Sequence, residues 1–267
     1  MNYIKTFTRD ARHFQIVTLS SLLLILLVWS DFAPPLEIIA LTLGGTLLTQ
    51  FLFLKGLKIP SNDYRSPLIT GLSLALLFKA NIIWLYPLVG AVAMASKFLI
   101  RVNNKHIFNP ANAGIVLALL FLPTQSWVSP GQWGNEVWLG FALICLAFIV
   151  LNKAGRADTA IFFLGCWIAL LVLRALWLGD PLVIPFHNLQ SGALLIFAFF
   201  MISDPMTTPN NRMMRFVFAL CVAVLAYVLQ YVFQVREAIF YALFAVCLLT
   251  PLLDFLLKDT PYQWRKV

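Results

Sequence analysis

The sequence predicts an all-α polytopic membrane protein with ten transmembrane helices in two inverted five-helix repeats, the third and eighth helices being short or broken. The composition, the spacing of the apolar runs and the placement of the basic residues lead to this prediction. Apolar residues make up 61% of the 267 residues and charged residues only 11%, whereas soluble chains average roughly 45–50% apolar. The chain has more apolar surface than a soluble core can bury, so we expect the lipid bilayer as a partner.

The apolar residues fall into ten runs, most of them near the ~20 residues that a helix needs to cross the hydrocarbon core. The runs are 14–32, 36–54, 66–80, 82–100, 110–123, 133–151, 157–178, 189–203, 214–233 and 238–257. No gap between them is long enough for a soluble domain, so residues 1–267 are expected to form one integral membrane domain. Its first repeat covers about 14–123 and its second repeat about 133–257.

The basic residues collect on one side of the predicted helices. If the N-terminus is cytoplasmic, every Lys and Arg except Lys79, Arg174 and Arg236 lies in an inner loop or at an inner helix end. This positive-inside pattern predicts a multi-pass protein of the cell inner (cytoplasmic) membrane with both termini in the cytoplasm. It also accounts for the net charge of +8 by topology, so nucleic acid is not expected as a partner.

The third and eighth runs are a matched pair of short helices. Each contains a hydroxyl residue followed by glycine, Thr70-Gly71 in the first half and Ser191-Gly192 in the second. Five crossings per half give the two halves opposite orientations, and matched interrupted helices of this kind point to a central ligand site. A second interpretation stays open, because small residues in membrane helices often serve only close helix packing.

Each short helix is followed by an Asx-Pro turn, Asn109-Pro110 and Asp204-Pro205. We expect Asn109 to cap a helix that begins at Pro110, and Asp204 to cap its turn in the same way. The exposed amide groups of such a helix start could bind an anion or a carbonyl, or the turns could have a capping role alone. We predict no catalytic residue and no metal ligand. The candidate cofactor-binding residues are Thr70, Gly71, Ser73, Asn109, Pro110, Asn112, Ser191, Gly192, Asp204 and Thr207.

Other residues indicate less specific roles. Lys97 and Arg101 are expected to extend to the membrane interface, and Arg174 is expected to pair with Asp180. The four cysteines, which lie in four different predicted helices, could hold an iron–sulfur cluster or simply pack as small apolar residues. They are Cys145, Cys166, Cys221 and Cys247. The sequence carries no Walker A motif, no paired histidines within the runs and no hydrolase motif, which argues against an ATPase, a transmembrane haem protein and a hydrolase.

Three segments together resemble one family of membrane subunits. They are Thr70-Gly-Leu-Ser-Leu-Ala-Leu, Phe108-Asn-Pro-Ala, and Ser191-Gly-Ala followed by Ser203-Asp-Pro-Met-Thr207. In this order they resemble the D subunit of Rnf electron-transport complexes and the B subunit of the sodium-pumping NADH:quinone oxidoreductase, over about residues 60–257. The resemblance implies ten helices in inverted repeats, flavin cofactors, and electron transfer coupled to ion movement.

The chain departs from that family where a flavin would be attached. Members usually carry an S-x-A-T motif after the fifth helix, but residues 122–133 contain none, so covalent FMN is not expected. We expect a non-covalent flavin, FMN or riboflavin, flanked by the two short helices and walled by the Phe-rich eighth run. The resemblance implies a membrane subunit of a flavin-dependent electron-transport system, with other redox membrane subunits or flavoproteins as partners.

Two functions of other classes remain open on the sequence. Inverted repeats with broken helices are also a transporter design, so the alternative is a transporter or channel for a small solute such as a flavin. A scaffold that only docks redox partners is the third possibility.

Overall fold

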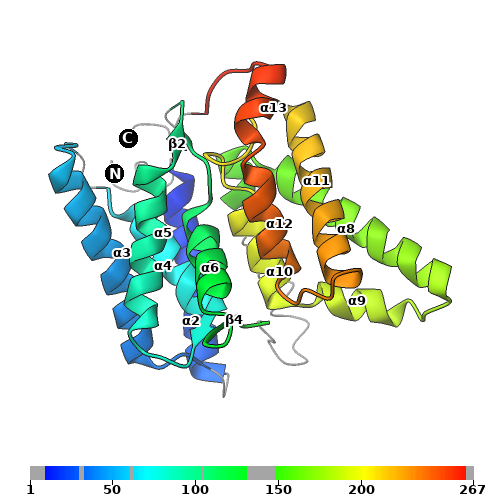
Figure 1. Cartoon of the computed structure of the whole chain (residues 1–267), viewed down its shortest axis with the longest axis horizontal. Coiled ribbons are helices and arrows are strands. Elements are labelled where there is room, and N and C mark those ends of the chain that lie inside the picture. Colours follow the sequence, from blue (N-terminus) through cyan, green and yellow to red (C-terminus); the bar gives the residue numbers. More distant parts are fainter. Residues whose placement is uncertain are drawn as a thin grey trace, which may run out of the picture. The chain divides into compact units, whose positions relative to one another are not determined.

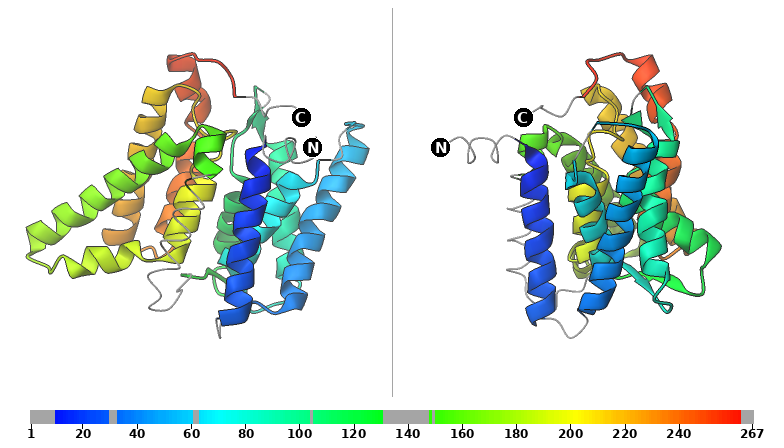
Figure 2. Two further views of the ribbon diagram at one scale, coloured as in Figure 1. Left: turned by 180° about the vertical axis from the view of Figure 1, so that it is seen from behind. Right: turned by 90° about the vertical axis from the view of Figure 1, so that its left-hand side faces the viewer.

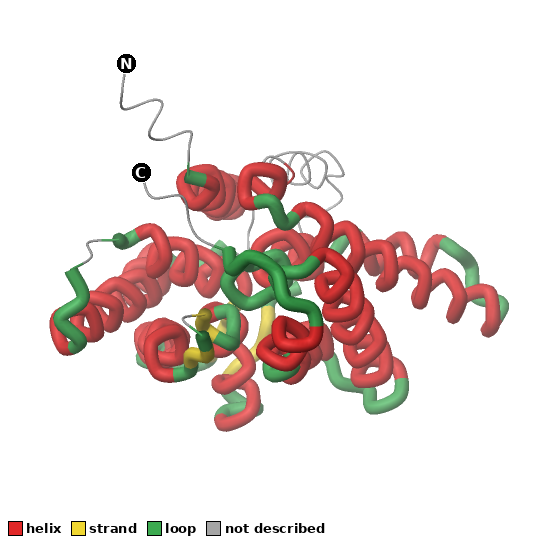
Figure 3. Tube along the Cα trace, turned by 90° about the horizontal axis from the view of Figure 1, so that it is seen from above, coloured by secondary structure: helices red, strands yellow, loops and turns green. Residues whose placement is uncertain are grey.

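The structure is a computed structural model that describes residues 10–29, 33–60, 63–103, 105–130, 148 and 150–262. The described chain is mostly helical, with four very short strands (Figures 1 and 3). It divides into two compact units, the first ending at Ser129 and the second covering Pro130–Tyr262.

The described part of unit 1 is a bundle of five helices, of which α4 and α6 are the most buried. The helices are α2 (Ala11–Trp29), α3 (Leu36–Gly56), α4 (Arg65–Leu77), α5 (Leu85–Leu99) and α6 (Pro110–Phe121). Helix α4 packs against α2 and α3, and α5 packs against α3 and α6; α2, in dark blue, runs beside the cyan α4 in Figure 2. Two small antiparallel strand pairs join the helix ends. They pair β1 (Phe78–Ala80) with β4 (Ser126–Val128), and β2 (Arg101–Val102) with β3 (Lys105–His106).

Helix α3 has three uncharged polar residues inside and several large apolar residues outside. Thr42, Thr46 and Gln50 are buried, whereas Leu48 and Phe51 are exposed. The threonine hydroxyls donate to backbone carbonyls of their own helix, so burial leaves them hydrogen-bonded. This distribution is typical of a helix that faces lipid, where small polar residues form the helix–helix contacts.

Unit 2 is built around a phenylalanine core. Its helices are α8 (Ala157–Leu178), α9 (Val183–Leu189), α10 (Gly192–Ile196), the π-helix η1 (Phe197–Met201), α11 (Arg212–Tyr231), α12 (Ala238–Cys247) and α13 (Thr250–Leu256). Helix α11 packs against both α8 and α12. The Phe197 ring lies 5.2 Å from the Phe163 ring and 5.5 Å from the Phe240 ring. These contacts join η1 to α8 and α12.

The described helices confirm a helical membrane protein but not the predicted number of ten crossings. Four helices are long and apolar enough to span a bilayer, namely α2, α3, α8 and α11, and up to six spans result if each of two bent helix pairs is one span. Helices α4, α5 and α6 are apolar but shorter. The predicted run 133–151 lies almost entirely outside the described residues. The inverted ten-helix arrangement therefore stays a prediction.

The short third and eighth helices are present. Helix α4 has 13 residues and continues as strand β1, so non-helical chain extends it. In the eighth run, α10 passes into the π-helix and is preceded by α9 at an angle of 57°. Helix α9 was not expected from the sequence, which predicted a loop there.

The unbroken helix predicted for residues 238–257 is wrong. Helix α12 ends at Cys247, and α13 begins at Thr250 with a bend of 48° between them. Pro251 lies in the first turn of α13. Proline has no N–H to donate to the carbonyl four residues earlier, and its ring clashes with that carbonyl. Cys247 holds that position, so the break falls where the proline requires it.

Candidate functional site

In unit 1, the predicted residues lie on α4 and at the start of α6. Thr70 and Ser73 of α4 are buried, as are Asn109 and Asn112, and α4 packs against α6. Asn109 caps α6, because its Oδ1 accepts the backbone N–H of Asn112 at 3.1 Å, and Pro110 occupies the first helical position. The predicted capping by Asn109 is confirmed.

Gly71 lies against α3. A methyl group at this position would lie 2.7 Å from Leu43 Cδ2 and 2.9 Å from Thr46 Oγ1, so the two helices approach each other closely here. Gly90 of α5 faces the same part of α3, close to Thr42 and Thr46. For Gly71 the structure therefore provides a helix-packing role, the second interpretation that the sequence left open.

In unit 2, the start of α10 is held by the chain itself. Ser191 caps this helix, accepting the N–H of Leu194 at 3.5 Å, and its hydroxyl donates to the carbonyl of Pro130 at 3.0 Å. The N–H of Ala193 donates to the same carbonyl at 3.1 Å. Gly192 is buried within this turn. Part of the hydrogen-bonding capacity that could bind a ligand is thus used within the unit.

The chain after the π-helix forms a buried turn around Asp204. The carboxylate of Asp204 accepts the N–H of Met206 at 3.0 Å, which confirms the predicted cap. Its backbone carbonyl accepts the hydroxyls of Thr207 at 3.2 Å and Thr208 at 3.1 Å. Thr250 Oγ1 of α13 donates to the carbonyl of Thr207 at 2.9 Å. These hydrogen bonds fix a non-helical segment inside unit 2 and bring its polar side chains together around Asp204.

The ten candidate residues are divided between the two units. Thr70, Gly71, Ser73, Asn109, Pro110 and Asn112 belong to unit 1, and Ser191, Gly192, Asp204 and Thr207 belong to unit 2. Within each unit they occupy helix starts, a close helix contact or the Asp204 turn. Their contact with a flavin stays a prediction.

The cysteines do not gather with other ligands in the described part of the chain. Cys166 and Cys221 are half-buried and Cys247 is buried, while Cys145 lies outside the described residues. Among those residues, no group of three or more His, Cys, Asp or Glu side chains is placed to hold a metal ion.

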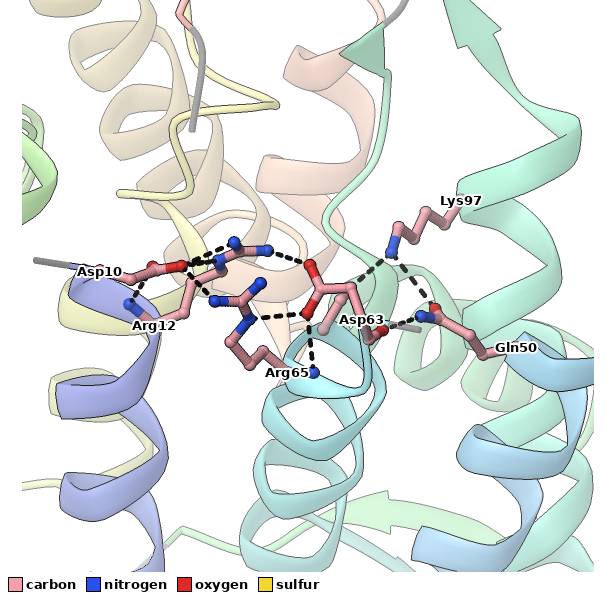
Figure 4. A network of polar contacts seen from close by, with 7 residues as sticks. Asp10, Arg12, Gln50, Asp63, Arg65 and Lys97 are labelled. Carbon is pink, nitrogen blue, oxygen red and sulfur yellow. Dashed lines mark hydrogen bonds and ion pairs between the residues drawn. The ribbon is translucent and has the colours of Figure 1, made fainter. Parts of the chain in front are cut away.

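Unit 1 contains an ion-pair network that the sequence analysis missed (Figure 4). Arg12 Nη2 lies 2.7 Å from Asp10 Oδ2, and Arg65 Nε lies 2.7 Å from Asp63 Oδ1. Each arginine also contacts the other aspartate, Arg12 at 2.5 Å from Asp63 and Arg65 at 2.8 Å from Asp10. The four side chains join the start of α2 to the start of α4 and balance each other in charge.

The network lowers the pKa values of its carboxyl groups. Burial alone would raise the pKa of Asp10, but hydrogen bonds from Arg12 and the charges of Arg12 and Arg65 bring it below its ordinary value. The pKa of Asp63 is lowered against the effect of burial in the same way, by Arg65 and Arg12. Both carboxylates therefore stay ionised at neutral pH.

Two polar side chains extend this network toward α3 and α5. Gln50 Nε2 donates to the backbone carbonyl of Asp63. Lys97 Nζ donates to Ser66 Oγ at 2.7 Å and lies 3.4 Å from Gln50 Oε1. Lys97 was expected to extend to the interface, which stays a prediction; its ammonium group contacts Ser66 and Gln50 within unit 1.

A second cluster of charged residues, also missed, lies in unit 2. Arg215 of α11 makes a two-point contact with Asp158 of α8, at 3.1 Å and 2.5 Å. Arg156, directly before α8, is equally buried, but its Nε has no hydrogen-bond partner among the described residues. Its guanidinium lies over the Tyr262 ring, 5.0 Å from the ring centre. Burial, together with the charge of Arg215, lowers the pKa of Arg156 despite the carboxylate of Asp158.

A sequence signal for the first network did exist. The pattern Asp-x-Arg occurs at Asp10–Arg12 and again at Asp63–Arg65, and in both copies the aspartate accepts the backbone N–H and the Nε of the arginine two residues later. The contact of each aspartate with the arginine two residues later could thus be predicted. The contacts between one Asp-x-Arg segment and the other could not.

Comparison with known proteins places the chain in a family. It is 25% identical over 279 residues to the D subunit of the ion-translocating oxidoreductase complex of Alcanivorax borkumensis, covering 81% of each chain. It is 29% identical over 138 residues to proteins of the same name from Salmonella paratyphi B and Salmonella newport, covering 51% of this chain but only 37% of theirs. The sequence pattern of the NQR2, RnfD, RnfE family matches residues 130–263, half of the chain. The chain belongs to the NQR2, RnfD, RnfE family.

Proposed function

We propose that this protein is a membrane subunit of an electron-transport complex and that it binds a flavin without a covalent bond. Its relatives are named as subunits of ion-translocating oxidoreductase complexes, and its apolar helices suit a membrane subunit. Coupling to ion movement and assembly with other redox subunits or flavoproteins belong to the same proposal. So do the placement in the inner membrane and the cytoplasmic position of both termini, which rest on the positive-inside pattern.

The observation that carries the proposal is the buried, non-helical chain around Asp204 in the family-matched half. Irregular backbone at membrane depth is tolerated only where protein or a polar cavity covers it. Here it follows directly on a π-helix, a feature frequent at functional sites. Ser203, Thr207 and Thr208 are buried beside Asp204, so polar groups are available within an apolar unit.

A flavin ring fits such surroundings in its chemistry. It needs an apolar, aromatic slot with a few polar groups at its edges. Asp204 and Thr207 would supply polar groups, and Phe199 and Phe200 of η1 would supply aromatic walls, because Phe197 is already packed among other rings. The S-x-A-T motif is absent from residues 122–133, so the flavin would be held by these contacts alone.

Purification of the full chain with its native membrane partners tests the proposal. We expect visible flavin absorbance, and release of FMN or riboflavin on denaturation without proteolysis. Asp204→Asn keeps the oxygen that accepts the Met206 N–H but removes the charge, so it should weaken flavin retention while the protein still folds. A complex that carries no flavin on this subunit would overturn the proposal.

A neighbouring threonine provides the matched control. Thr207 and Thr208 both donate to the Asp204 carbonyl and both are fully buried, but only Thr207 is a predicted site residue. Thr207→Val should reduce bound flavin more than Thr208→Val at equal protein yield. Equal losses would show that the hydroxyls act only on the fold of the turn.

A transporter for a small solute such as a flavin is the second candidate, and the bent helix pairs favour it. Unit 2 contains two such pairs, at 57° and 48°, and discontinuous helices line the substrate sites of many transporters. Uptake of labelled riboflavin into vesicles that contain only this protein would support transport. Flavin that is retained at a fixed ratio through purification, without uptake, would support the redox function.

A further inference from the structure

An open groove of about 560 Å³ lies on unit 1, between the second half of α3 and the chain that leads into α4. Its walls are mostly apolar and include Leu47, Phe51, Leu54 and Ile59, while Lys55 and Tyr64 add polar groups. A volume of this size falls in the range of pockets that bind small molecules, roughly 300–1,000 Å³.

The apolar part of the groove belongs to the lipid-facing surface of α3. Only 22% of this candidate span is buried within the structure, and Phe51 is 60% exposed. An acyl chain of the bilayer would therefore contact this surface without displacing protein. The groove differs from the rest of the surface in that the chain before α4 gives it a second wall.

The polar end of the groove carries excess positive charge. Asp63 lines the groove, but its carboxylate is neutralised by Arg12 and Arg65 in the ion-pair network. Lys55 lines the groove in the last turn of α3, and Lys58 follows it in the chain. The side chain of Lys55 lies above Phe51, with Nζ 6.0 Å from the ring centre, at the boundary between apolar and polar surface.

We propose that this groove binds an anionic phospholipid. One acyl chain lies along Leu47, Phe51 and Leu54, the phosphate lies beside Lys55, and Tyr64 lies at the level of the headgroup, where tyrosine side chains are enriched. Basic residues at the cytoplasmic end of membrane helices attract anionic lipid headgroups. The assignment is independent of the flavin and of the electron-transport function.

Retained lipid is measured by native mass spectrometry on the detergent-purified full chain, together with the thermal shift on adding phosphatidylglycerol, phosphatidylcholine or soluble glycerol phosphate. We expect phosphatidylglycerol to bind and to stabilise more than phosphatidylcholine, with no shift from glycerol phosphate. Equal shifts from the two lipids would mean nonspecific lipid contact and would overturn the proposal. A shift from glycerol phosphate alone would identify a soluble phosphate as the ligand and would also overturn it.

Two matched pairs of variants separate the groove from its surroundings. Leu47→Trp fills the groove, whereas Leu48→Trp adds the same bulk at a residue that is 59% exposed and lies outside it; only the first should abolish retention of the lipid. Lys55→Gln should weaken phosphatidylglycerol binding about fivefold. Lys258→Gln should leave binding unchanged, although Lys258 also lies over a phenylalanine, Phe255, at 5.9 Å. Equal effects within either pair would refute the groove as the binding site.

Discussion

Arg65 Nη1 lies 2.8 Å from Asp10 Oδ2, a contact that joins the first residues of α4 to the residue that precedes α2. The side chain of Asp10 is only 1% exposed, so its carboxylate is shielded from water, whereas that of Arg65 is 26% exposed. Arg12 makes the reciprocal contact with Asp63. Each Asp-x-Arg segment makes its own local contact, and each arginine also contacts the aspartate of the other segment. These crossed contacts hold the starts of α2 and α4 together.

Asp10→Asn should destabilise unit 1 by about 3 kcal/mol, because it leaves Arg12 and Arg65 without one of the two carboxylates that balance them. Thermal or denaturant unfolding in detergent measures the effect. In a double-mutant cycle with Arg65→Gln, we expect a coupling energy on the order of 1 kcal/mol or more.

Asp180→Asn is the control for this prediction. Asp180 pairs with Arg174 at 3.3 Å, as the sequence predicted, but both side chains are about one-third exposed. Exposed pairs contribute at most about 1 kcal/mol, so the control should change stability little. If Asp10→Asn and Asp180→Asn lost equal stability, burial would not explain the contribution of the ion-pair network.

Acid should weaken unit 1. The pKa values of Asp10 and Asp63 are lowered from 3.8 in the folded state, so the unfolded chain binds protons first as the pH falls. Their contribution is therefore complete above about pH 5 and is lost as the pH falls through 3.8 toward the lower folded pKa values. Unfolding curves between pH 6 and pH 3 measure this loss.

The variant Asp10→Asn/Asp63→Asn should be less stable at neutral pH but should lose less further stability on acidification. Its unfolding curve against pH should be flatter than that of the unchanged protein below pH 5. Parallel curves for the two proteins would assign the acid sensitivity to other groups.

Local sequence determined the features that could be predicted. The caps made by the Asn109 and Asp204 side chains depend on atoms within three residues, and Arg174 lies six residues from Asp180. The break before α13 was also readable in principle, since Pro251 excludes a continuous helix. Its position inside a long apolar run concealed it.

Contacts distant in the sequence could not be predicted from composition and spacing. Arg65 and Asp10 are 55 residues apart. Arg65 was interpreted only as a basic residue of an inner loop, and Asp10 was not singled out. For Gly71 the sequence favoured a ligand site and left helix packing open as a second interpretation. Only the position of α3 beside it, with Leu43 and Thr46 in contact, distinguishes the two roles.

Gly71→Leu should prevent normal packing of α4 on α3. Even a Cβ atom would lie 2.7 Å from Leu43 Cδ2 and 2.9 Å from Thr46 Oγ1, and overpacking of this kind costs about 1–3 kcal/mol or more. Gly44→Leu, on the facing helix α3, is the control, because a Cβ there meets no atom within 4 Å. Unfolding temperature in detergent distinguishes the two variants, and equal stability of both would contradict the close contact at Gly71.

Arg156 and Arg215 should respond in opposite ways to replacement by methionine. Both are 7% exposed, but Arg215 neutralises Asp158 by a two-point contact, whereas Arg156 has no carboxylate in direct contact among the described residues. Arg215→Met leaves a buried carboxylate without its main partner and should cost about 3–5 kcal/mol. Arg156→Met removes a buried charge that also repels Arg215, so it should be neutral or stabilising. Chemical unfolding of both variants decides the matter. A large loss of stability in Arg156→Met would mean that the guanidinium is held by contacts stronger than its stacking on Tyr262.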